Sequence, residues 1–202
     1  MCGKTTEDYI DVVERLGDEP VDMLEINISC PNVKEGGIAF GQDPKAVEAI
    51  TKAVKAHAKQ PVVMKLSPNV TDITVMAKAA EAGGADAISL INTLTGMKID
   101  INRRTFAVAN KTAELSGPAI RPVAVRMVYQ AAQAVKVPII GMGGICNADD
   151  ALEFNPCRRN CSSYRYCKLP QTHMQLIKTV DGIKAYMEKY GIEDINELIG
   201  AV

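Results

Sequence analysis

The chain has 202 residues, of which 47% are hydrophobic and 23% are charged, and its formal net charge is -1. These values are typical of a single globular domain with its own core. The near-neutral charge argues against a nucleic-acid-binding surface, and the apolar runs are too short to cross a membrane. Residues 1–8 are polar and acidic, unlike a signal peptide, so we expect a cytoplasmic protein with reduced cysteines.

Apolar strand-like runs alternate with amphipathic helical stretches from Thr5 to about Leu152. The predicted strands are 21–28, 61–66, 87–91 and 137–142. The predicted helices are 7–16 capped by Thr5, a helix starting at Asp43 and Pro44, 71–82, 118–135, a helix from Asn147 or Ala148 to Phe154, 180–190 and 193–199.

The alternation indicates an α/β fold with a parallel sheet. The strands are apolar on both faces, as in a buried parallel sheet, and the helices between them form βαβ units. Such units build either a (β/α)8 barrel or an open doubly wound sheet. The polar and glycine-rich residues follow the strand C-termini, where both architectures place their sites.

A long insertion over 93–117 interrupts the alternation of strands and helices. Its segments 98–101 and 106–108 alternate enough to predict a small β-hairpin. We expect this hairpin to cover the mouth of the site.

Residues 155–178 differ from the rest of the chain. The segment is basic, contains Cys157, Cys161 and Cys167, and has no clear period. A zinc site with His173 is one interpretation, but the spacings match no strong zinc pattern. We favour a shifted reading frame, because one permitted set of codons moved by one base encodes a helix end, an apolar strand and a Gly-Thr turn at Arg165-Tyr166.

The most specific motif is Asn27-Ile-Ser-Cys30-Pro-Asn-Val, followed by Gly36-Gly37. Asparagine amides can hold a planar ligand rich in heteroatoms, and a thiol beside them can act as a general base. Alternatively, Cys30 is a buried thiol in a turn that Pro31 fixes.

Two further strand ends carry candidate ligand contacts. Lys65 follows a buried run and could balance anionic charge in a barrel mouth, or it could extend to solvent. Asn92 and Thr93 end the third strand and suit a planar ligand, or they form a strand-end turn. Gly143-Gly144 precedes a helix and could approach a phosphate, although such turns often need glycine. Gly117 is equally ambiguous alone.

Together these motifs closely resemble the catalytic chain of class 1 dihydroorotate dehydrogenase. The matching stretches, in order, are NISCPNVKEGG, VMKLSPNV, INTLTGM, LSGPA and GMGGI. The 33–37 stretch is similar to the NAD-linked type, class 1B.

The resemblance implies a (β/α)8 TIM barrel that binds FMN and oxidises dihydroorotate to orotate in pyrimidine (UMP) biosynthesis. Cys30 matches the catalytic base, and Asn27 matches a residue touching FMN and substrate. The other matches are Asn92 and Thr93 for substrate, and Lys65, Ile91, Gly117, Gly143 and Gly144 for FMN. The resemblance also implies an oligomer and a partner subunit that carries FAD and a 2Fe-2S cluster and links to NAD.

The chain departs from that family in two ways. The family has further barrel strands before the point that Met1 matches, so we expect residues 1–202 to form a single incomplete barrel of about five βα units. In addition, the segment 155–178 replaces the family's last phosphate-binding Gly-Thr and its eighth strand. An unstable chain with poor FMN binding is therefore expected, and the alternatives are an inactive remnant or a non-redox phosphate-binding barrel.

Overall fold

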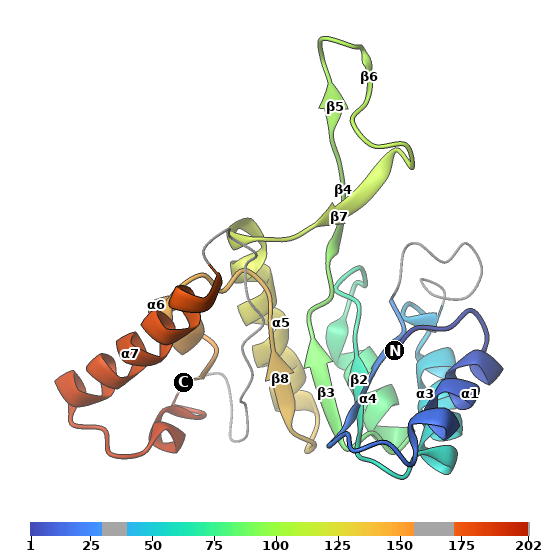
Figure 1. Ribbon diagram of the computed structural model, residues 1–202, viewed down its shortest axis with the longest axis horizontal. Coiled ribbons are helices and arrows are strands. Elements are labelled where there is room, and N and C mark those ends of the chain that lie inside the picture. Colours follow the sequence, from blue (N-terminus) through green and yellow to red (C-terminus); the bar gives the residue numbers. More distant parts are fainter. Residues whose placement is uncertain (30–39, 156–171, 202) are drawn as a thin grey trace.

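The computed structural model describes residues 1–29, 40–155 and 172–201, without the side chains of residues 172–175 (Figure 1). Three sequence predictions fall outside the described residues: the proposed base Cys30, the stretch 33–37, and the Arg165-Tyr166 position within the anomalous segment. The same holds for the zinc-site interpretation, because its cysteines and the side chain of His173 are not described.

The centre of the molecule is a parallel sheet of four strands in the order β1-β2-β3-β8. The strands are β1 Leu24–Asn27, β2 Val62–Lys65, β3 Ala87–Leu90 and β8 Ile139–Gly141. All three pairings are parallel. Each predicted strand is present but shorter than predicted. Within the described residues the sheet does not close into a barrel.

Helices follow the strands in the alternation that the sequence predicts. They are α1 Thr6–Leu16, α3 Pro44–His57, α4 Ile73–Ala82 and α5 Arg121–Ala134. Thr5 caps α1 through a capping box, and Asp43 caps α3, both as predicted. The prediction that Thr71 opens the next helix is wrong by one residue, because the Asp72 side chain accepts the Thr74 N–H.

The two faces of the sheet differ in character. Ile26, Met64 and Ile88 belong to one face, and they are fully buried in a hydrophobic core with side chains of the helices. Residues alternate between faces along a strand, so Glu25 and Lys65 lie on the opposite face. The helices therefore cover one face, and the other face carries polar side chains beside apolar ones such as Val63.

A long β-ribbon projects from the sheet after β3 (Figure 1). Its root pairs β4 Leu94–Met97 with β7 Thr112–Leu115, and its tip pairs β5 Ile99–Asp100 with β6 Thr105–Phe106. The predicted hairpin is the tip of this ribbon. The root was not predicted, because Thr95, Gly96 and Glu114 give it no clear apolar alternation.

The remaining elements lie toward the C-terminus. A 3-10 turn η1, Pro118–Ile120, precedes α5, where the sequence predicted one continuous helix. The short helix α6, Ala148–Leu152, is capped by Asn147, and α7, Thr172–Tyr190, is followed by the 3-10 turn η3, Ile195–Leu198. In the part of the chain that the structure describes, no helix is both long and apolar enough to span a membrane.

Candidate functional site

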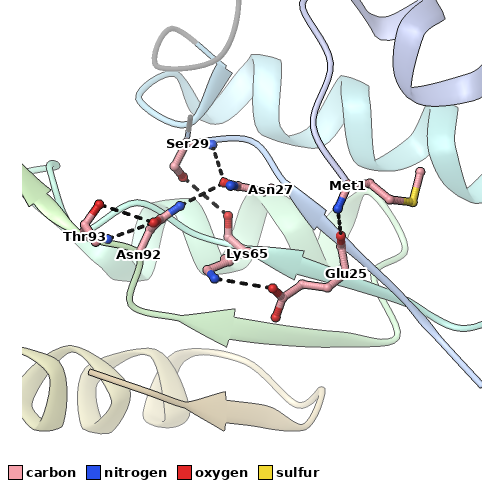
Figure 2. A network of polar contacts seen from close by, with 7 residues as sticks. All are labelled: Met1, Glu25, Asn27, Ser29, Lys65, Asn92 and Thr93. Atoms are coloured by element: carbon pink, nitrogen blue, oxygen red, sulfur yellow. Dashed lines mark hydrogen bonds and ion pairs between the residues drawn. The ribbon is translucent and has the colours of Figure 1, made fainter. Parts of the chain in front are cut away.

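The face of the sheet that carries Lys65 holds an ion pair with one buried partner. The Lys65 side chain is only 6% exposed, and its Nζ lies 3.4 Å from Oε1 of Glu25 on the neighbouring strand (Figure 2). A buried ammonium needs a compensating partner, and this distance is long for a charge-assisted hydrogen bond. Lys65 therefore keeps donor capacity for an anionic or electron-rich group. The sequence alone left open whether this lysine extends to solvent, and in the structure its side chain is buried.

Two asparagines that are distant in the sequence meet at the C-terminal end of the sheet. Asn92 Nδ2 donates to Oδ1 of Asn27 at 2.8 Å, although 65 positions separate the two residues (Figure 2). The same Asn27 oxygen accepts the Ser29 N–H. The order β1-β2-β3 brings the ends of β1 and β3 to the same edge, which is why both amides line one site.

The backbone of Asn27 is held from two sides. Its N–H donates to the carbonyl of Met1 at 2.9 Å, and its carbonyl accepts the Tyr9 hydroxyl at 2.7 Å. Tyr9 lies on α1 and is fully buried. The Met1 ammonium also donates to the carbonyl of Glu25, so Met1 occupies the edge of β1 (Figure 2). These contacts fix the direction in which the Asn27 amide points.

Thr93 links the sheet to the ribbon. Its N–H donates to Oδ1 of Asn92 at 2.8 Å, and its hydroxyl donates to Oε1 of Glu114 on β7 at 2.8 Å. A cavity of about 510 Å³ opens between this ribbon root and the strand ends. Ser29, Ser67, Asn69, Thr93 and Glu114 are among its lining residues. The root of the insertion borders this cavity, and that the predicted hairpin at its tip covers the mouth of the site stays a prediction.

The predicted glycines gather at the C-terminal end of β8. A Cβ on Gly144 would lie 2.8 Å from the Gly117 carbonyl oxygen and 2.9 Å from the Arg121 nitrogen, at a φ of +77°. A Cβ on Gly143 would lie 3.3 Å from Cγ1 of Ile91. Gly117, Gly143, Gly144 and Ile91 are thus brought together, and close approach of backbone explains both adjacent glycines.

One buried polar atom lacks a partner beside Lys65. Ser89 is opposite Lys65 in the strand register and is fully buried, and its Oγ has no hydrogen-bond partner among the described residues. Buried hydroxyls are nearly always satisfied, so this oxygen points to a group that completes the site. An ammonium, a free hydroxyl, two amides and bare glycine backbone form a donor set that fits a planar, anionic, phosphate-bearing cofactor such as FMN.

Sequence reasoning missed several residues of this site. Glu25 and Ser89 were identified only as parts of apolar strands, Glu114 only as part of the insertion, and Asn69 only as part of the VMKLSPNV motif. A signal was present for Glu25, because it is two residues before Asn27 and therefore shares its face. The partnership with Lys65 carried no sequence signal, because it depends on which strands are neighbours.

Comparisons with known proteins agree on one family. The family model described as dihydroorotate dehydrogenase matches residues 1–158, which include every predicted site residue. A protein of Lachnoclostridium phytofermentans, described as dihydroorotate dehydrogenase B (NAD(+)), catalytic subunit, is 62% identical over 202 residues, covering 100% of this chain and 67% of its own length. A protein of Maridesulfovibrio salexigens with the same description is 64% identical over 139 residues, covering 68% of this chain and 46% of its own length.

A solved structure supports the fold. The crystal structure of the Eimeria tenella protein, described as DHODH in complex with ferulenol, superposes with a TM-score of 0.76. The superposition covers 97% of this chain and 57% of the Eimeria tenella chain, at 21% sequence identity. At this identity the likeness shows that the parallel sheet and its helices are part of a TIM-barrel fold.

Proposed function

The chain belongs to the dihydroorotate dehydrogenase family, and from this premise we propose that it oxidises dihydroorotate to orotate in pyrimidine biosynthesis with FMN as its cofactor. The observation that carries the proposal is the contact between Asn27 and Asn92. Two amides that share one hydrogen bond keep further donors and acceptors free, and Ser29 and Thr93, which follow them in the chain, line a cavity large enough for a small planar ring.

The residues proposed to hold FMN lie beside the unpartnered Ser89 hydroxyl and in the glycine cluster at the end of β8. Lys65, Ile91, Gly117, Gly143 and Gly144 are the proposed cofactor contacts, together with Asn27. When bound, FMN supplies the acceptor for the hydride that leaves C6 of the substrate. The buried Lys65 ammonium provides a fixed positive charge for the electron-rich side of the cofactor, in a site where water screens little.

The chain's own residues would bind the substrate and move one proton. Asn27, Asn92 and Thr93 would fix the ring of dihydroorotate through its amide and carbonyl groups. Cys30 is proposed to accept the C5 proton as a thiolate base. The support for Cys30 comes from the sequence motif and from its position one residue after Ser29, since Cys30 is outside the described residues.

We further propose that the electrons leave through a partner subunit. Relatives described as catalytic subunits of a NAD(+)-linked enzyme imply such a second chain. Its FAD and 2Fe-2S cluster would pass the electrons to NAD. A cytoplasmic location and an oligomeric assembly complete this proposal, and they rest on composition and on the family.

The test is anaerobic reduction of the FMN-loaded chain by dihydroorotate. We expect the flavin absorbance to bleach as orotate forms, at a rate at least about tenfold lower in Asn92→Ala, because the partly buried hydrogen bond to Asn27 and a proposed substrate contact are lost. Asn102→Ala is the matched control, since Asn102 lies in the exposed turn at the ribbon tip. FMN binding without reduction would favour a non-redox phosphate-binding barrel, and no FMN binding would favour an inactive remnant.

A further inference from the structure

Asn69 lies in the loop after β2, and its side chain holds the root of the ribbon. Its Nδ2 donates to the carbonyl oxygen of Thr93 at 3.0 Å, and its Oδ1 accepts the N–H of Thr95 at 2.9 Å. One side-chain amide thus bonds the backbone on both sides of Leu94, as a peptide group of a neighbouring strand would. Asn69 therefore takes the place of a strand at the edge of β4.

This clamp has a defined orientation. A backbone N–H can only donate and a carbonyl can only accept, so the two contacts require the Asn69 oxygen toward Thr95 and its nitrogen toward Thr93. The Nδ2 group also donates to Oγ of Ser67 at 3.3 Å, and that same oxygen accepts the Asn69 N–H. Aspartate lacks the donor and alanine lacks both groups. Aspartate therefore removes only the contact to Thr93, whereas alanine removes the contacts to both Thr93 and Thr95.

The clamp acts where the proposed substrate residues leave the sheet. Thr93 bonds Asn92 on one side and Glu114 across the ribbon on the other, and Asn92 in turn bonds Asn27. Asn69 is in the loop after β2, and it bonds the backbone of Thr93, which is itself a proposed substrate contact. An isolated two-stranded ribbon is marginally stable in water, so its root needs an anchor if Thr93 is to keep one position.

We propose that Asn69 is a positioning residue that sets the affinity of the site for its planar substrate by fixing Thr93 and Asn92. This inference rests on the proposed function. Asn69 contacts neither Lys65 nor the glycine cluster among its described hydrogen bonds, so its effect is on the substrate and not on FMN.

The experiment compares Asn69→Ala, Asn69→Asp and the control Asn102→Ala in the full chain. Amide hydrogen exchange followed by NMR reads the clamp without cofactor or substrate. The Thr95 amide should exchange about tenfold faster in Asn69→Ala, which is the loss of one hydrogen bond, and should stay protected in Asn69→Asp, which keeps the acceptor. A Thr95 amide that exchanges freely in the unchanged chain would overturn the proposal.

The second reading uses the FMN-loaded chain. We expect KM for dihydroorotate and Kd for orotate to rise about threefold to tenfold in both Asn69 variants, with kcat and Kd for FMN within about twofold. A merely structural residue would lower kcat and FMN affinity together, and that result would contradict the proposal. A chain with the expected Thr95 exchange that binds no orotate would instead refute the proposed function, and with it the substrate role of Asn69.

Discussion

The sheet and the ribbon of this molecule are stabilised by different interactions. In the sheet, Ile26, Met64, Ile88 and Leu90 are fully buried against helices. In the ribbon, large apolar side chains stay in contact with water, and Ile101 is 79% exposed. The sheet is held by its packing, whereas the ribbon is held by backbone pairing and by a few side-chain contacts at its root.

The difference explains how the site is built. The sheet supplies fixed amide and ammonium groups at the ends of its strands, because a packed core leaves those strands little freedom. The ribbon supplies a wall that polar contacts fasten to the sheet at Thr93 and Thr95. Substitutions in the packed core of the sheet should therefore change folding, and substitutions at the ribbon root should change ligand binding.

The largest expected effect is in the core. Ile88→Ala removes a fully buried side chain from β3 and should lower the free energy of unfolding by about 2–5 kcal/mol. Ile101→Ala removes the same atoms from the ribbon and should change it by less than about 0.5 kcal/mol. Urea denaturation followed by circular dichroism measures both. Equal losses would show that the ribbon tip is as well packed as the sheet.

A second comparison concerns two glycines. Gly144→Ala places a Cβ 2.8 Å from a backbone oxygen at a φ of +77°, so it should cost about 1–3 kcal/mol and weaken FMN binding. Gly96→Ala in the ribbon places a Cβ 3.2 Å from the Leu115 Cβ and 3.9 Å from the Ala113 carbonyl oxygen, and has no positive φ. It should be close to neutral. The same denaturation series tests this pair, and a neutral Gly144→Ala would mean that the β8 turn can relax.

The ion pair between Lys65 and Glu25 should respond differently to the loss of each partner. Glu25→Gln leaves the Lys65 ammonium buried without its carboxylate and should cost about 1–2 kcal/mol, since Glu25 is partly exposed. Lys65→Met removes the buried charge itself and should cost less, while reducing FMN affinity. Glu114→Gln in the ribbon, where the carboxylate is exposed, should leave unfolding nearly unchanged. A larger cost for Lys65→Met than for Glu25→Gln would contradict this order.

The smallest expected effect is a pH dependence at the start of β2. Burial raises the pKa of Asp86, but hydrogen bonds from the Lys55 ammonium and the Val62 N–H outweigh it, so the pKa lies below its ordinary value of 3.8. A lowered carboxyl pKa stabilises the fold at pH values above 3.8, and this contribution is lost as the pH falls toward the lower folded-state pKa.

Asp86→Asn should therefore flatten the acid side of the stability profile by less than about 1 kcal/mol, because the carboxylate is partly exposed. The measurement is the free energy of unfolding from pH 6 downward in both proteins. An identical acid limb in the variant would show that the two hydrogen bonds do not persist in solution.

Most of the helices and strands could be predicted because they depend on local chemistry. The Thr5 cap of α1 and the Asp43-Pro44 start of α3 were predicted from a few residues each. Strand lengths were overestimated, because an apolar run such as 21–28 extends beyond the residues that find a pairing partner. The ribbon root was missed for the converse reason, since its pairing does not need an apolar pattern.

The sequence by itself determined the α/β alternation, the family and the identity of most candidate site residues, because motifs and periodicity are properties of neighbouring positions. Only the tertiary structure decided which of these residues meet. The strand order set Asn27 against Asn92, put Glu25 beside Lys65, left the Ser89 hydroxyl without a partner, and brought Asn69 to the ribbon root. The physical reason is that contacts between distant positions are fixed by sheet register and burial, which local sequence does not encode.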